Sequence, residues 1–548
     1  MFRKTKDIKP NSDDIANQFS ARRKRFFSKP DAWHNVFYDN VTSKIPEELF
    51  SVLYDEKIWR PNIPISLFMW MLILKEGHWW SDEQLFEHVQ FNVLVMKALW
   101  LVDLRDEVPA MSTYYLFKQR LYNYQEETGT DLIWECFLQL TGIQAKIFWV
   151  TGEHLRMDSK LIWSNIAVCS RLQLVMDCIK KFYKGLRKEK KQQITEEDNV
   201  IIKQILKESS WNAVFRLTNQ EKKEYLEELW NLLMRLQETY DEDDSEWYND
   251  LVRIFKDQFS IWEDIIAKEG KDISPNSLQS VHDVDATYRK KWKQKVHWYS
   301  VNVTETCNKE GVNLITDIIL DKSTRADCNF LKDALESSEK VVGNIGNSYQ
   351  DGAYNSKENN EFWKDKNINL YYTGIQGKRW RFSPKIDKDD IFITDTKDGN
   401  TYLALILKSG NCKIQIKEGD EIKSYYFKKD AIDTALKRDE VDSLPKEIKN
   451  IRPNVEATIF QISFRLRNNK TRYRGSYKNS IQLTCRAMWI NLRRIQIGGV
   501  CLKAKKGINI VKNGYIIKLI NYLSFLKNTF WDITYVFAKR INFPIIKN

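Results

Sequence analysis

Acidic residues are missing from one long stretch of this 548-residue chain. No Asp or Glu occurs from Ala457 to Trp531, whereas the same stretch contains 15 Lys or Arg residues. The net charge of +12 for the whole chain therefore divides into +17 for residues 457–548 and −5 for residues 1–456. A cationic region of this length predicts contact with a polyanion, and we expect phosphate binding where the cations concentrate.

Other absences exclude whole classes of protein. The eight cysteines form no C-x-x-C pair and no zinc-finger spacing with the six histidines, which predicts reduced, mostly buried thiols. The first residues contain no apolar signal-peptide core, and the longest apolar run, Ile63–Leu74, is shorter than the ~20 residues that cross a bilayer. The sequence therefore predicts a cytoplasmic protein with no membrane role.

The N-terminal part is basic and then helical. Residues 1–30 form a polar, basic segment that is typical of a flexible arm, and residues 31–145 have helical periodicity. Ser81 and Gln84 fit a capping box, which predicts one helix extending to Met96. Short helices of this kind fit a helix-turn-helix-like DNA-binding domain and an ordinary helical bundle equally well.

Strands and helices alternate in the middle of the chain. An extended segment is expected to end at Asp158, and a long helical block follows it. Further strands are predicted at 285–306, 314–320, 349–354 and 368–373, and further helices at 325–341, 356–366, 454–466 and 478–497. The order predicts an α/β core of the ribonuclease-H-like type, a mixed sheet flanked by helices, with an N-terminal all-α domain, a helical insertion and a β-rich insertion.

The predicted domains follow from this order. A basic flexible arm (1–30) precedes a helical DNA-binding domain (31–145). The predicted catalytic core consists of residues 146–170, 281–384 and 451–513, and its last part contains the helix with Glu456 and the basic region. A helical insertion (171–280) and a β-rich insertion (385–450) interrupt the core, and a C-terminal tail (514–548) follows it.

Three carboxylates occupy informative positions. Asp158 and Asp351 fall at predicted strand ends, and Glu456 falls in the first turn of a predicted helix. Hard oxygen ligands suit Mg²⁺ or Mn²⁺, and a pair of such ions can drive in-line displacement at phosphorus. The chain has 74 acidic residues, however, so spacing alone leaves open that each is a turn residue or a glutamate favoured by a helix dipole.

Several stretches around these carboxylates resemble, in order, the motifs of DDE transposases from bacterial insertion sequences. The first-aspartate motif is similar to Arg156–Ala167, and the second-aspartate motif is similar to Asp351–Ser356 with Asn359. The remaining similar stretches are the downstream turn Thr373–Gly377, the glutamate region Val455–Gln461 with Arg467–Gly475, and the N-terminal stretches Arg60–Pro64, Met71–Glu76 and Ser112–Tyr115.

This resemblance implies a DNA transposase that binds element ends and performs Mg²⁺-dependent strand cleavage and strand transfer by a two-metal DDE mechanism. Asp158, Asp351 and Glu456 would form the catalytic triad and hold two Mg²⁺ ions, for which Mn²⁺ can substitute. The implied partners are the terminal inverted repeats, target DNA and a second copy of the chain in a homodimeric complex. The implied location is the nucleoid of a bacterial cytoplasm.

Cations and one tryptophan are the candidate DNA contacts. Arg452 is a candidate phosphate clamp, and Trp380 could stack on an unpaired base or pack in the core. The predicted phosphate-binding residues after the glutamate are Arg465, Arg467, Lys470, Arg472 and Arg474.

The sequence also departs from the family pattern. A hairpin-forming subgroup has Tyr, Arg and Lys at fixed offsets from its glutamate; Arg452 fits, but Lys449 and Ser463 stand at the other two offsets, so hairpin formation is not predicted. Trp163 stands where a small residue is expected, and its ring would either crowd the metal site or pack in the core. These departures, together with the apolar, irregular tail after Gly507, support one alternative, a catalytically inactive DNA-binding protein derived from a transposase. A structure-selective nuclease on the same core, which cuts DNA without strand transfer, is a further alternative.

Overall fold

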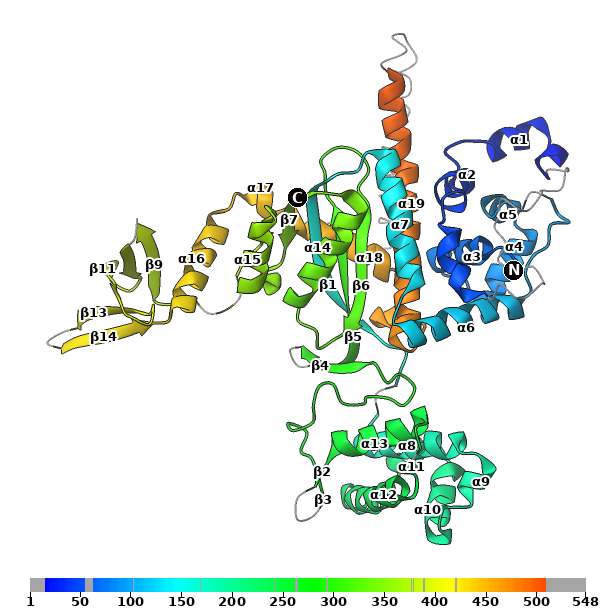
Figure 1. The fold of residues 1–548 in the computed structure, drawn as a ribbon, viewed down its shortest axis with the longest axis horizontal. Coiled ribbons are helices and arrows are strands. Elements are labelled where there is room, and N and C mark those ends of the chain that lie inside the picture. The colour runs from blue at the N-terminus through cyan, green and yellow to red at the C-terminus, as the bar shows by residue number, and fades with distance from the viewer. Residues whose placement is uncertain are drawn as a thin grey trace, which may run out of the picture.

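A mixed six-stranded sheet forms the centre of the molecule (Figure 1). The computed structural model describes residues 15–54, 63–101, 103–167, 169–241, 243–261, 265–291, 294–375, 377, 379–387, 390–418 and 421–508. The strands are β1 (Gly152–Trp163), β4 (Thr287–Lys291), β5 (Gln294–Thr306), β6 (Ile315–Lys322), β7 (Ile345–Gln350) and β8 (Asn369–Tyr372). Their order is β6-β5-β1-β7-β8, with β4 beside the first half of β5.

Strand direction changes at β1. β1 pairs antiparallel with β5, and β5 pairs antiparallel with β4 and β6. On its other side β1 pairs parallel with β7, and β7 pairs parallel with β8. The predicted α/β class is confirmed, because this mixed sheet has helices on both faces.

Two pairs of helices cover the sheet. α14 (Cys328–Val342) and α15 (Lys357–Asp365) pack on the face that carries Leu155 and Met157 of β1. α18 (Val455–Ser463) and α19 (Ser476–Ile508) lie over the opposite face. Successive strand side chains point to opposite faces. Arg156, Asp158 and Lys160 therefore lie on the α18 face.

The N-terminal helices share one apolar core with the sheet and α19. This core extends from Val36 to Ile495 and includes Val301 and Val303 of β5. Figure 1 shows α7 on one side of α19 and α3 on the other side of α19. The N-terminal helices are η2 (Ile15–Gln18), α1 (Ala21–Phe27), α2 (Trp33–Phe37), η3 (Tyr38–Thr42), η4 (Glu47–Leu53), α3 (Ile65–His78), α4 (Asp82–Phe91), α5 (Val93–Ala98), α6 (Met111–Thr128) and α7 (Leu132–Phe148).

The prediction of a single helix from Ser81 to Met96 is wrong, because the chain leaves the helix at Asn92 and begins a second one. The capping box of Ser81 and Gln84 is confirmed, but α4 ends at Phe91. Asn92 has extended backbone angles, and its side-chain oxygen accepts from the amides of Leu94 and Val95. An asparagine can cap a new helix in this way while the apolar spacing continues unchanged.

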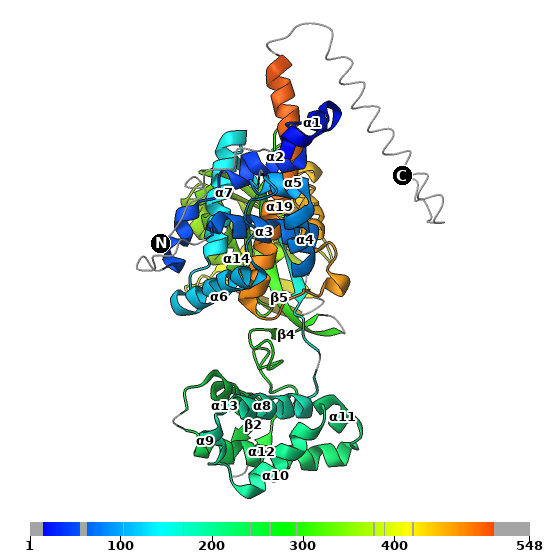
Figure 2. The same cartoon turned by 90° about the vertical axis from the view of Figure 1, so that its right-hand side faces the viewer.

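The helical insertion forms a unit with its own core (Figure 2). Its helices are α8 (Arg171–Gly185), α9 (Lys188–Lys191), α10 (Glu196–Lys207), α11 (Ser210–Phe215), α12 (Asn219–Thr239) and α13 (Glu246–Gln258). A short hairpin of β2 (Phe259–Ile261) and β3 (Ile265–Ala267) follows, so the end of the predicted helical block is not helical.

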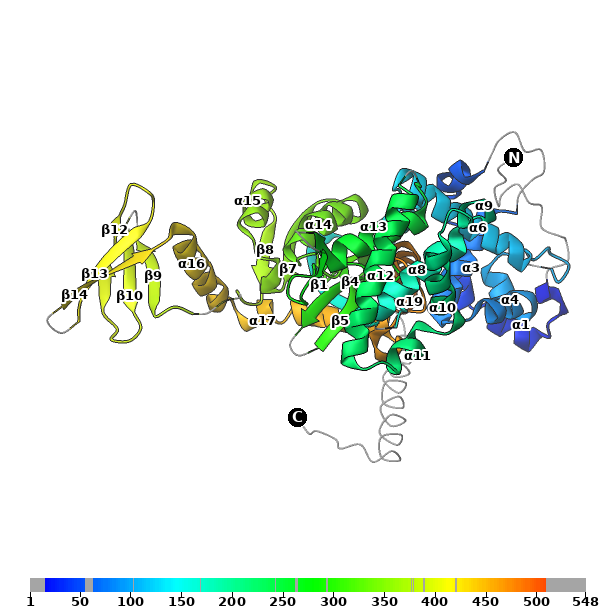
Figure 3. The ribbon, with the colours of Figure 1, turned by 90° about the horizontal axis from the view of Figure 1, so that it is seen from below.

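The β-rich insertion extends away from the N-terminal helices (Figure 3). One three-stranded sheet contains β9 (Phe382–Asp387), β10 (Asp390–Asp395) and β11 (Thr401–Leu403). A second contains β12 (Leu405–Ile406), β13 (Cys412–Glu418) and β14 (Glu421–Phe427). The helices α16 (Lys429–Ser443) and α17 (Lys446–Lys449) then return to the core, followed by the 3₁₀ turns η6 (Arg452–Asn454) and, after α18, η7 (Arg467–Asn469).

Several predictions concern parts of the chain that lie outside the described residues, namely positions 1–14 of the basic arm and the tail 514–548. The cysteines whose side chains are described are free thiols, and Cys136, Cys178, Cys412 and Cys485 are buried. Among the described helices, none combines the length and apolar character needed to cross a membrane.

We expect the fragment 169–284 to fold without the rest of the chain, because its buried apolar residues pack on one another. Expressed alone, it should show a helical circular dichroism spectrum and one cooperative thermal transition. A fragment that lacks a cooperative transition would show that the insertion depends on the sheet for stability.

Candidate active site

The sheet places Asp158 and Asp351 side by side. In the parallel pair of β1 and β7, Arg156 lies opposite Tyr349, and the same register continued by two residues sets Asp158 opposite Asp351. β7 ends at Gln350, whereas β1 continues to Trp163 along β5. The expectation that the strand ends at Asp158 is therefore wrong: antiparallel pairing with β5 extends it. The two aspartates lie where β7 separates from β1.

The backbone after Asp351 is tightly packed. Asp351 caps the 3₁₀ turn Gly352–Tyr354, and its Oδ1 accepts from the amide of Gly352 at 2.5 Å. A Cβ atom on Gly352 would come within 1.8 Å of the carbonyl oxygen of Gly374. Only glycine leaves room for this close approach of the two backbone segments.

Arg452 joins all three predicted carboxylates. Its Nη2 lies 2.6 Å from Asp158 Oδ1 and 3.8 Å from Asp351 Oδ2. Its Nη1 donates to Glu456 Oε1 at 3.1 Å, one helical turn away in the first turn of α18. The predicted placement of Glu456 in a first helical turn is confirmed. The three carboxylates therefore converge on one guanidinium.

The three carboxylates differ in exposure. The side chain of Asp158 is 14% exposed, that of Asp351 44% and that of Glu456 64%. Burial raises the pKa of Asp158 above its ordinary value, and the neighbouring Arg452 opposes that rise. The cluster therefore has one carboxylate inside the protein and two that face solvent, all oriented by the same cation.

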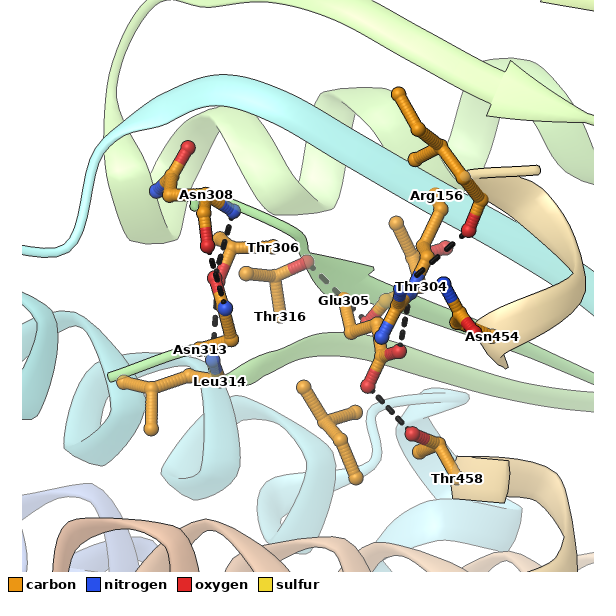
Figure 4. Close-up of polar contacts among 12 residues, drawn as sticks. Arg156, Thr304, Glu305, Thr306, Asn308, Asn313, Leu314, Thr316, Asn454 and Thr458 are labelled. Carbon is orange, nitrogen blue, oxygen red and sulfur yellow. Dashed lines mark hydrogen bonds and ion pairs between the residues drawn. The ribbon is translucent and has the colours of Figure 1, made fainter. Parts of the chain in front are cut away.

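A second ionic cluster, centred on Glu305, holds α18 against the sheet (Figure 4). Glu305 of β5 is fully buried and accepts from Arg156 Nε at 2.6 Å. Its other oxygen lies 2.7 Å from Arg494 Nη2 of α19 and accepts from Thr458 Oγ1 of α18 at 2.6 Å. Arg156 also donates to the carbonyl oxygen of Ile451, the residue before Arg452. Glu305 therefore links the sheet to the elements that carry Arg452 and Glu456.

Lys160 belongs to the same face and was not predicted. It lies two residues after Asp158 on β1, and its Nζ donates to Ser463 Oγ of α18 at 2.9 Å. Burial lowers the pKa of Lys160. Strand alternation places Lys160 beside Asp158, but only the fold shows that its amine meets Ser463, the position at which the hairpin-forming subgroup has lysine.

Trp163 does not crowd the carboxylates. It lies five residues after Asp158 on β1, so strand alternation places it on the opposite face of the sheet. At about 3.3 Å per residue it is also about 17 Å farther along the strand. The departure from the family pattern at this position therefore does not affect the site.

The predicted phosphate-binding cations divide into two groups. Arg472 donates to the carbonyl oxygens of Trp79 and Trp80 and so caps the end of α3, while Lys470 donates to the carbonyl of Ile166. Arg465, Arg467 and Arg474 are exposed, and two of them also donate to main-chain carbonyl oxygens, Arg465 to that of His78 and Arg474 to that of Asn165. The first group binds the fold together, and the second faces solvent.

Trp380 lies apart from the carboxylates, at the start of the β-rich insertion. Its ring is 6.2 Å from that of Phe427 on β14, and its side chain is 40% exposed. It therefore both packs on the insertion and presents a surface to solvent.

The donor set fits a hard divalent cation, because all three converging groups are carboxylates. Within the described residues, however, no three His, Cys, Asp or Glu side chains lie close enough together to hold one ion. Arg452 lies between the carboxylates instead. Ion binding would require the carboxylate side chains to close together and the guanidinium to move away from Asp158.

Comparison with known proteins identifies the N-terminal helices. Residues 25–120 match a family described as a transposase domain, DUF772. This stretch extends from within α1 to within α6 and precedes all three carboxylates. No curated protein and no solved structure matches the chain. The match supports a transposase family.

We expect Glu305→Ala to destabilise the protein strongly, because it leaves Arg156 and Arg494 without their buried carboxylate. Removing one partner of a buried ion pair costs about 3–5 kcal/mol. The free energy of unfolding in urea should fall by that amount, whereas Glu361→Ala, at an exposed position of α15, should change it by less than about 0.5 kcal/mol. Equal effects of the two substitutions would contradict the role of Glu305.

Proposed function

We propose that the chain is a DNA transposase that cleaves and joins DNA strands at the site formed by Asp158, Asp351 and Glu456. The observation that carries the proposal is the convergence of these three carboxylates on Arg452 from three separate elements. The transposase-domain match at residues 25–120 supports it independently, because that stretch contains none of the three.

The proposed catalytic core is of the ribonuclease-H-like type. A mixed sheet with helices on both faces supports this, as do two insertions that fall between the elements carrying the carboxylates. The helical insertion separates β1 from β5, and the β-rich insertion separates β8 from α18. These insertions account for the long separations between Asp158, Asp351 and Glu456.

In this proposal each residue has a defined task. Asp158, Asp351 and Glu456 would hold two Mg²⁺ ions, which activate the attacking oxygen and stabilise the leaving oxygen at phosphorus. Arg452 neutralises the carboxylates before DNA binds and then moves to a phosphate oxygen, to which a guanidinium can donate twice. Lys160 supplies a further cation on the same face. Terminal repeats, target DNA and a second copy of the chain are the proposed partners.

A second candidate is a DNA-binding protein without catalytic activity. The observation that favours it is Arg452 itself, which lies 2.6 Å from Asp158 and occupies the space between the carboxylates. If the guanidinium remained there with DNA bound, the chain would bind DNA with a strong salt dependence and leave it uncut.

We expect Asp158→Asn and Glu456→Gln each to lower cleavage at least about 100-fold, since each removes a negative metal ligand. The substrate is the DNA on either side of the coding region, where the proposal places inverted repeats, incubated with Mg²⁺, and the products are separated on a denaturing gel. Joined strands identify a transposase, and cuts without joining identify a nuclease.

The matched controls are Asp387→Asn and Glu361→Gln, two exposed carboxylates on other elements, which should cleave like the unchanged chain. Cleavage that persists in Asp158→Asn would refute the assigned triad. An unchanged chain that binds the repeats but never cuts them would establish the second candidate.

We expect Arg452→Met to make stability depend on divalent cations. Without the guanidinium the three carboxylates repel one another, so the midpoint of thermal unfolding should fall in EDTA and rise in Mg²⁺ by more than it does in the unchanged chain. Differential scanning fluorimetry measures both shifts. Equal Mg²⁺ shifts in the two proteins would show that the carboxylates do not bind the ion.

A further inference from the structure

A hollow lined by aromatic rings and arginines lies beside the carboxylate cluster. It has a volume of about 340 Å³ and opens between α3, α18 and α19. Cavities of this size accept small molecules or single groups of larger ligands. We refer to it as the α18 pocket, lined chiefly by His78, Trp79, Phe460, Phe464, Arg465 and Arg493.

The pocket continues the face of α18 that carries Glu456. Phe460 lies one turn after Glu456 on α18, so these two side chains share a face of the helix, about 6 Å apart along its axis. Phe464 directly follows the last residue of α18, and its ring packs beside that of Phe460. The two rings are 62% and 48% exposed and lie 5.7 Å from each other. Two exposed rings in contact offer an apolar surface on which a planar ligand can stack, and here that surface adjoins a pocket.

The pocket also carries cations that the fold does not neutralise. Arg494 is paired with Glu305, and Arg486 donates to the carbonyl oxygens of Gln461 and Glu76. Arg465 donates to the carbonyl oxygen of His78 and lies 5.9 Å from the centre of the Phe464 ring, and Arg493 donates to the side chain of Gln496. Neither guanidinium pairs with a carboxylate among the described residues. These two exposed guanidiniums favour an anionic ligand.

Two further polar groups at the pocket have no partner. His78 Nε2 and Trp79 Nε1 are buried and make no hydrogen bond within the described part of the chain. Burial lowers the pKa of His78 to about 4, so its ring is neutral near pH 7. Unpaired buried donors and acceptors are costly, but both atoms are closed off from solvent and so belong to the pocket wall rather than to the surface that a ligand contacts.

We propose that the α18 pocket binds an unpaired nucleotide of DNA. The base stacks on Phe460 and Phe464, and the adjoining phosphate contacts Arg465 and Arg493. Aromatic rings bind bases without sequence preference, and guanidiniums bind phosphate in two-point contacts. The identification of the ligand as the strand next to the cleaved phosphodiester rests on the proposed function. An apolar protein segment would match the rings but would leave the two cations uncompensated.

The test compares single-stranded with duplex DNA. Fluorescence anisotropy is measured with a fluorescein-labelled oligonucleotide, alone and annealed to its complement, at fixed salt without divalent cations. The double variant Phe460→Ala, Phe464→Ala should bind the single strand about ten-fold more weakly and the duplex within about two-fold of the unchanged chain. Tryptophan at both positions should restore single-strand binding, because a stacking surface is retained.

The arginines are tested through salt. Arg493→Ala should weaken single-strand binding and lower the slope of log affinity against log salt by about one, the value for one lost phosphate contact. Phe215→Ala and Arg187→Ala alter exposed residues of the helical insertion and should leave both quantities unchanged.

Two outcomes would overturn the proposal. One is single-strand affinity that stays unchanged in the double variant, and the other is single-strand affinity that falls equally with duplex affinity. A change of oligomeric state in sedimentation with unchanged single-strand affinity would assign the pocket to a protein interface instead. If the chain binds single strands through the pocket but never cuts DNA, the nucleotide site is supported and the proposed transposase function is refuted. If it cuts DNA but does not bind single strands through the pocket, only the nucleotide site is refuted.

Discussion

One buried carboxylate determines where the candidate active site can form. Glu305 has no access to solvent, so its charge must be matched inside the protein, and Arg156 of β1 and Arg494 of α19 provide the match. Thr458 of α18 completes the set. Because these partners come from different elements, satisfying Glu305 places α18 over β1. Glu456 and Arg452 then lie beside Asp158, so the ion cluster around Glu305 positions the candidate site.

The cations after Glu456 fall into two kinds, those that hold the fold together and those that face solvent, and the net charge of the region does not distinguish them. Arg472 and Arg486 donate to main-chain carbonyls near the end of α3, and Arg494 neutralises Glu305, so these cations join the N-terminal helices, α18 and the sheet. Arg465 and Arg493 remain exposed around the α18 pocket. The acid-free sequence serves both purposes, since an added carboxylate would compete for cations needed by the fold and by a phosphate.

The sequence correctly predicted features that depend only on residues close together in the chain. The capping box at Ser81 and the first-turn position of Glu456 are confirmed because both depend on neighbours within one helical turn. The strand end at Asp158 and the unbroken helix to Met96 were wrong, since pairing with β5 and the capping by Asn92 decide them. The role of Glu305 and the α18 pocket arise from contacts between distant segments, so no pattern in one segment could reveal them. Strand alternation could place Lys160 beside Asp158, but its contact with Ser463 depends on the fold.

The central claim is that Asp158, Asp351 and Glu456 bind divalent metal together. Crystals grown with Mn²⁺ test it directly, because an anomalous difference map locates the ion without assumptions about activity. The account predicts Mn²⁺ peaks in contact with all three carboxylates and Arg452 displaced from Asp158. Crystals at saturating Mn²⁺ with no peak at these residues, and with the Arg452–Asp158 ion pair intact, would contradict it.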